Sequence, residues 1–156
     1  MQVYIIRHGH AVDEGFGLSD ESRYLSKKGR KNVREVGRVL RDAKVELDAI
    51  LTSPLVRAVQ TAELIAERLD FVGIVEAVPA LAPGVPPRII AAELASRGAR
   101  VAVFGHEPGL SALGAFLCGR PSFPPFRKAQ VSLVEDGKPL WFINPDTLER
   151  DRLLLA

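Results

Sequence analysis

Three histidines of this 156-residue sequence, His8, His10 and His106, lie close after runs of apolar residues. The runs are Val3–Ile6 and Val101–Phe104. Continuous apolar runs of this kind are typical of strands that are buried on both faces of a parallel sheet. The carboxyl ends of such strands meet at one edge of the sheet, where open α/β folds bind their ligands. We therefore expect the imidazoles to share a crevice at that edge.

Two arginines belong to the same predicted edge. Arg7 precedes His8, and Arg57 falls in the first turn of a helix expected after Ser53 and Pro54. A cation in a first turn opposes the helix dipole by about 0.3–1 kcal/mol unless it faces an anion. Guanidinium groups neutralise phosphoryl oxygens, and a neutral imidazole can attack phosphorus. The combination predicts a phosphoryl-transfer site.

A second interpretation treats His8, His10 and His106 as zinc ligands. Alternate residues of a strand point the same way, and three histidines can hold a catalytic metal. The two arginines disfavour this interpretation, because both would repel a dication and no nearby carboxylate is placed to offset them. We therefore expect neither a metal nor a cofactor.

The remaining pattern alternates strands and helices and predicts an α/β fold. A loop over 11–24 leads to a helix capped by Ser26 and ending near Asp42. A strand over 48–52 precedes a helix with Ser53 as N-cap and Pro54 as its first residue. The expected elements that follow are strand 72–78, helix 88–96, strand 101–104, helix 110–118, strand 129–134 and strand 140–143. The Asp136-Gly137 turn makes the last two strands an antiparallel pair, and 147–156 is a tail or short helix. The fold is then three layers, a mainly parallel sheet between helices, in one domain over 1–156.

Composition limits the class of protein. Hydrophobic residues make up 47% and charged residues 26%, as in ordinary globular domains. Cys118 is the single cysteine, so no internal disulfide can form and a cytoplasmic protein is expected. We also expect the protein to be a monomer. No apolar run reaches the roughly 18 residues of a membrane span, and Arg7 interrupts the first run too early for a signal peptide. A net charge of +2 does not favour a nucleic-acid partner.

Three motifs together resemble the histidine phosphatase superfamily, which has the phosphoglycerate-mutase-like fold. They are Arg7-His8-Gly9, the stretch Ser53-Pro54-Leu55-x-Arg57-Ala58-x-Gln60-Thr61-Ala62, and Gly105-His106. The small bacterial protein-histidine phosphatases of the SixA type are the most similar branch. They are similar also in length, in the Arg23-x-Leu25-Ser26-x-x-Gly29 segment and in Trp141-Phe142.

The resemblance implies that His8 is the nucleophile and that Arg7, Arg57 and His106 bind the phosphoryl oxygens. It places Arg23 at the pocket and His10 on the rim of the pocket. The SixA type has an aspartate at the position of His10. Glu107 follows His106 and is a candidate proton relay or binding residue.

The resemblance also concerns a missing carboxylate. Larger members of the superfamily protonate the leaving oxygen with a glutamate after the third strand. With Leu81 aligned to that motif, Pro83 stands in the place of the glutamate and has no proton to donate. An alkyl phosphoester needs such an acid, commonly for about 10²- to 10⁴-fold in rate, whereas a phosphohistidine can leave as neutral imidazole.

We therefore expect a phosphatase that hydrolyses phosphohistidine on a partner protein, such as a phosphotransfer domain, through phospho-His8. Two alternatives remain open at this point. One is a small-molecule phosphomonoesterase of the same fold, and the other is a module that binds phosphoproteins without catalysis.

Overall fold

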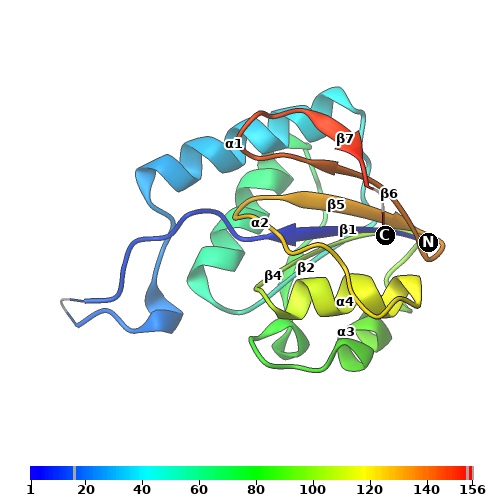
Figure 1. Cartoon of the computed structure of the whole chain (residues 1–156). Helices are drawn as coiled ribbons and strands as arrows, with labels where there is room; N and C mark the ends of the chain where they lie inside the picture. The colour runs from blue at the N-terminus through cyan, green and yellow to red at the C-terminus, as the bar shows by residue number, and fades with distance from the viewer. Residues whose placement is uncertain (16, 154, 156) are drawn as a thin grey trace.

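In the computed structural model, which describes residues 1–15, 17–153 and 155, seven strands form one mixed sheet (Figure 1). The strands are β1 Gln2–Arg7, β2 Ala49–Thr52, β3 Val75–Ala77, β4 Arg100–Gly105, β5 Val131–Glu135, β6 Lys138–Ile143 and β7 Arg150–Arg152. Their order across the sheet is β3-β2-β4-β1-β5-β6-β7. The pairs among β1 to β4 are parallel, and β5, β6 and β7 are joined antiparallel. The predicted mainly parallel sheet between helices is confirmed.

Helices cover both faces of the sheet. Helices α1 (Lys27–Asp42) and α2 (Val56–Arg68) pack on one face, and α3 (Pro87–Leu94) and α4 (Gly109–Cys118) lie together on the other (Figure 1). Short 3-10 turns, η1 (Asp20–Ser22) and η2 (Pro79–Leu81), interrupt two connecting loops. Within the described part of the chain, no helix is both long and apolar enough to cross a membrane.

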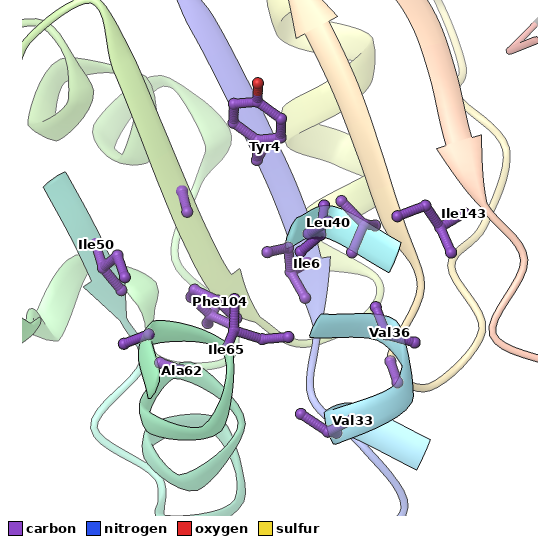
Figure 2. Close-up of a cluster of buried hydrophobic side chains, with 14 of the residues drawn as sticks. Tyr4, Ile6, Val33, Val36, Leu40, Ile50, Ala62, Ile65, Phe104 and Ile143 are labelled. Atoms are coloured by element: carbon purple, nitrogen blue, oxygen red, sulfur yellow. The ribbon is translucent and has the colours of Figure 1, made fainter. Parts of the chain in front are cut away.

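Strand β1 lies between two hydrophobic layers, which explains its unbroken apolar sequence. Tyr4 and Ile6 face α1 and α2, whereas Val3 and Ile5 belong to the cluster beneath α3 and α4. Figure 2 shows the first cluster, in which the inward stripe of α1 meets the sheet. Burying one such side chain stabilises a fold by about 1.5–3 kcal/mol, so the two layers hold β1 firmly in place.

The strand register aligns three carboxyl ends at one edge of the sheet. Arg7, the last residue of β1, pairs with Gly105, the last residue of β4. On the other side of β4, Thr52 of β2 pairs with Phe104. The residues that leave these three neighbouring strands therefore emerge side by side.

Three details differ from the sequence expectations. Helix α2 has Leu55 as its N-cap and begins at Val56, so Ser53 and Pro54 are not its cap and first residue. The strand expected over 72–78 is confined to β3. The side chains of Val72 and Ile74 are exposed, and the backbone pairs with β2 only from Val75 onward. The expected antiparallel pair is extended by β7, which occupies part of the presumed tail. The charged sequence of β7 carries no apolar alternation that could have predicted a strand. Within the presumed tail, residues 154 and 156 lie outside the described residues.

Candidate active site

Three polar side chains stand in a row where the aligned strands end. Ser53 follows β2, His106 follows β4 and His8 follows β1. All three are buried, and the exposed fractions of His8 and His106 are 6% and 7%. The imidazole rings of His8 and His106 lie with their centroids 5.1 Å apart. The register of the sheet thus brings together residues that are far apart in sequence.

His8 has one ring nitrogen engaged and one available. Its Nδ1 lies 2.8 Å from the carbonyl oxygen of Gly9, which can only accept, so Nδ1 carries the proton. Burial is the main cause that lowers the pKa of His8 to about 3, and the hydrogen bond to Gly9 opposes it. Smaller contributions from His106, Arg57 and Arg7 lower the pKa of His8 further. His8 is therefore neutral near pH 7, with a free lone pair on Nε2.

His106 is oriented by Ser53. Its Nε2 lies 2.7 Å from Ser53 Oγ, and that hydroxyl already accepts a bond from the backbone N–H of Leu55 at 3.2 Å. Among the hydrogen bonds of the described residues, Nε2 of His106 is the one acceptor for the Ser53 hydroxyl proton, so Ser53 donates to Nε2 and the ring proton of His106 resides on Nδ1. Burial, followed by the charge of Arg57, lowers the pKa of His106 to about 4. His106 is thus a neutral donor near pH 7.

Each of the two arginines is held by a backbone carbonyl and has a buried Nε without a partner. Arg7 Nη1 donates to the carbonyl of Phe126 at 2.8 Å, and Arg57 Nη1 donates to the carbonyl of Asp20 at 2.8 Å. Among the described residues, three buried side-chain nitrogens have no hydrogen-bond partner, namely Arg7 Nε, Arg57 Nε and His106 Nδ1. Unpaired buried donors are costly, and all three belong to residues near enough to His8 to lower its pKa. They form a cradle suited to an oxyanion.

The polar residues after Arg57 explain the rest of its motif. Thr61 Oγ1 donates to the carbonyl of Arg57 at 2.7 Å and accepts from the N–H of Gly9 at 3.1 Å. Gln60 Oε1 accepts from the N–H of Leu25 at 2.7 Å. One turn of α2 therefore fixes both the loop after His8 and the start of the segment that leads into α1.

Gly9 and Gly29 are needed for close packing beside the nucleophile candidate. A Cβ on Gly29 would lie 2.0 Å from the carbonyl oxygen of His10, and a Cβ on Gly9 would lie 2.6 Å from a methyl group of Val33. Both contacts are closer than real Cβ atoms tolerate. The glycines thus let α1 press directly against the loop that carries His8.

Asp20 is a site residue that the sequence analysis missed. Its carboxylate contacts Arg57 Nη2 at 3.3 Å and Arg23 Nη1 at 3.0 Å, while Arg23 Nε donates to the carbonyl of Val12 at 2.7 Å. Arg23 therefore reaches the site through Asp20. The Asp20-x-x-Arg23 spacing on a short turn was the available signal, because residues three apart on such a turn lie on the same side.

His10 lies at the rim but not beside the two other imidazoles. Its Nδ1 is 2.6 Å from Ser26 Oγ, the group that caps α1 by accepting from Gly29 N–H. In the described residues, no three histidine, cysteine, aspartate or glutamate side chains are grouped as ligands of a metal ion. The geometry does not offer the trihistidine arrangement that the zinc interpretation requires.

Glu107 is engaged by the backbone. Its two carboxylate oxygens accept from the N–H of Ser111 at 2.8 Å and of Phe126 at 3.1 Å. Since Phe126 also accepts from Arg7, Glu107 fixes the segment that orients this arginine.

Comparison with known proteins agrees with this geometry. The model of the histidine phosphatase superfamily (branch 1) matches residues 3–82. The phosphohistidine phosphatase SixA of Escherichia coli (strain K12) is 34% identical over 96% of this chain and 97% of its own. The structure of the protein histidine phosphatase SixA complexed with tungstate matches with a TM-score of 0.86 and 30% identity, over 96% of this chain and 100% of that one. A putative SixA from Agrobacterium tumefaciens shares the fold, with a TM-score of 0.76, 20% identity and coverage of 86% and 90%.

Proposed function

Because the chain belongs to the histidine phosphatase superfamily, we propose that it hydrolyses phosphohistidine on a partner protein. The observation that carries the proposal is the cradle of three unpaired donors, Arg7 Nε, Arg57 Nε and His106 Nδ1, beside the free Nε2 of His8. The similar SixA structure holds tungstate, an oxyanion, which supports the assignment of this cradle to a phosphoryl group.

The reaction has two steps in this proposal. The lone pair on His8 Nε2 attacks the phosphorus of a phosphohistidine whose other ring nitrogen carries a proton. The P–N bond of the substrate breaks, and the substrate leaves as neutral imidazole with the bonding electrons. Arg7, Arg57 and His106 bind the phosphoryl oxygens and stabilise the charge of the transition state. A water molecule then attacks phospho-His8, which releases inorganic phosphate and regenerates neutral His8.

The loop before α3 supports a P–N substrate. A cavity of about 50 Å³ beside His106 is lined by residues 81–85, so Pro83 stands close to the site rather than away from it. Proline cannot supply a proton to a leaving alkoxide. An imidazole leaving group has less need of a general acid, because the pKa of its conjugate acid is near 6.5.

The test is phosphate release from a histidine-phosphotransfer domain that has been phosphorylated on its histidine. Wild-type protein should release phosphate, and His8→Ala should not. A panel of phosphorylated metabolites serves as the comparison. Faster turnover of a phosphomonoester than of the phosphohistidine protein would instead support the small-molecule phosphatase. Tight binding of the phosphoprotein by the wild type without any turnover would support a non-catalytic module.

A further inference from the structure

A groove of about 660 Å³ opens beside the catalytic edge of the sheet. Its walls are the amino-terminal half of α1, residues 127–128 and residues 145, 146 and 148, and His10, two residues after His8, also lines it. The far wall is fixed by Asn32 Nδ2, which donates to the carbonyl of Pro145 at 2.8 Å. The groove is therefore a built concavity between tethered elements.

The groove is lined with lysines that have no charged partner. Lys28, Lys31 and Lys128 are exposed, and none of them forms an ion pair with any other described residue. Arg127, which also lines the groove, is paired with Asp146 at 2.6 Å. Glu35 and Asp146 are the acidic residues of the lining, so the surface is positive because of the three lysines.

Short, rigid connections join these lysines to the nucleophile. Lys128 precedes Ala129, whose N–H donates to the carbonyls of Arg7 and His8 at 3.1 and 3.0 Å. Lys28 precedes Gly29, which packs directly against the backbone of His10. Lys128 is thus joined to the backbone of His8, and Lys28 is joined to the loop that follows His8.

His10 is close to the ammonium groups of Lys28 and Lys128. Burial is the largest cause that lowers the pKa of His10, and the charges of Lys128 and Lys28 come next. Arg23, which bonds to Asp20 at the active site, contributes to the same lowering of the pKa of His10. His10 is therefore close to three cations, Lys28, Lys128 and Arg23, with the carboxylate of Asp13 opposing them.

We propose that this groove docks an acidic surface beside the phosphohistidine of the partner protein and so presents the phosphoryl group to His8. The inference rests on the proposed function, because it assumes a protein substrate. A nucleic acid fits less well, since Glu35 and Asp146 interrupt the positive surface and no phenylalanine, tyrosine or tryptophan lines the groove for base stacking. Charges at the rim of an interface chiefly raise the association rate and weaken as salt is added.

The test is a double charge reversal with a matched control. Lys28→Glu/Lys31→Glu changes the groove, whereas Arg120→Glu/Lys138→Glu makes the same change of net charge at exposed positions beyond α4 and on β6. Each protein is assayed on a phosphorylated acidic phosphotransfer domain and on free phosphohistidine, at low and high salt. The groove variant should lose about tenfold or more in kcat/KM on the protein substrate, mainly through KM, and less than about twofold on free phosphohistidine.

The salt series gives a second readout. The wild type and the control variant should slow on the protein substrate as salt rises, and the groove variant should respond much less. Equal rates for the groove and control variants on the protein substrate would overturn the docking proposal alone. A wild type that releases no phosphate from any phosphohistidine protein would overturn the proposed function and the docking with it. Retention of RNA by the wild type that the groove variant loses, with protein turnover unchanged, would also overturn the docking proposal.

Discussion

The guanidinium of Arg57 is held by Asp20 through two contacts. Nη1 donates to the Asp20 carbonyl at 2.8 Å, and Nη2 lies 3.3 Å from the Asp20 carboxylate. The pKa of Asp20 is lowered, first by its hydrogen bond from Arg23 and then by Arg57, so the carboxylate is charged. A negative group therefore occupies part of the cationic surface that a phosphoryl group would use. The contact aligns Arg57 but opposes the binding of an anion.

We expect Asp20→Asn to bind inorganic phosphate more tightly than the wild type. The amide keeps the size of the side chain and removes the charge that repels the anion. The inhibition constant for phosphate should fall about three- to tenfold, as expected for one charge removed at close range near the surface. Asp42→Asn, at the far end of α1, is the matched control and should not change it. An unchanged inhibition constant in Asp20→Asn would show that the carboxylate does not compete with phosphate.

Arg57→Ala should lower kcat/KM by at least about 10²-fold while leaving the fold intact, because its guanidinium acts most on charge in the transition state. Arg57→Lys should recover little, since an ammonium cannot replace the forked donors that contact both Asp20 and the oxyanion. Steady-state kinetics and circular dichroism measure both effects. Near-wild-type rates in the two variants would remove Arg57 from the proposed mechanism.

Ser53→Ala should lower kcat/KM by roughly fivefold. The substitution removes the hydroxyl that holds His106 Nε2, so the ring proton is no longer fixed on Nδ1, and one hydrogen bond of this kind corresponds to about 1 kcal/mol. Ser132→Ala is a suitable control, because this buried serine belongs to β5 and its hydroxyl accepts from Gln130 Nε2 at 3.4 Å, away from His106. Equal losses in the two variants would indicate a general effect of removing a buried hydroxyl.

The buried histidines make stability depend on pH. The pKa values of His8 and His106 are lowered from 6.5 to about 3 and about 4, so between pH 6.5 and about 4 the unfolded chain binds protons that the folded protein does not. The free energy of unfolding should therefore decrease as the pH decreases below 6.5, by up to about 1.4 kcal/mol per pH unit for each histidine. Urea unfolding at pH 7 and pH 5 measures this. The variant His8→Gln/His106→Gln should lose less stability over the same interval, and an identical loss would contradict the assignment.

The catalytic edge could be predicted from sequence because each contributor carried a local signal. His8 and His106 follow apolar strands, and parallel strands end at a common edge whatever their order. Arg57 stood out as a cation in a first helical turn. These signals depend on backbone periodicity and on helix electrostatics, both of which short windows of sequence contain.

The roles of Ser53, Asp20 and Glu107 could not be predicted in the same way. Ser53 before a proline resembles an N-cap, and only the pairing of β2 with β4 shows that its hydroxyl meets His106. Asp20 reaches Arg57 across 37 positions, and Glu107 reaches Phe126 across 19, through loops without periodicity. Such contacts depend on the tertiary path of the loops, and the Asp20-x-x-Arg23 spacing signals only the local pair, not the contact with Arg57.

The last prediction concerns His8 as the covalent nucleophile. His8 and His106 are both neutral, buried imidazoles, so their pKa values alone do not rank them. The hydrogen bonds do rank them, because Ser53 occupies Nε2 of His106 while the bond to Gly9 leaves Nε2 of His8 free. We expect the phosphoryl group to be held on His8 Nε2 between the two steps.

Rapid mixing with ³²P-labelled phosphohistidine protein, followed by an alkaline quench that preserves the acid-labile product, should place label on the peptide that contains His8. His8→Ala should abolish both label and turnover. His106→Ala should slow phosphorylation without moving the label, because it removes a donor to the phosphoryl oxygens and not the attacking nitrogen. Label on His106, or full turnover by His8→Ala, would reverse the assignment of nucleophile and donor within the same fold.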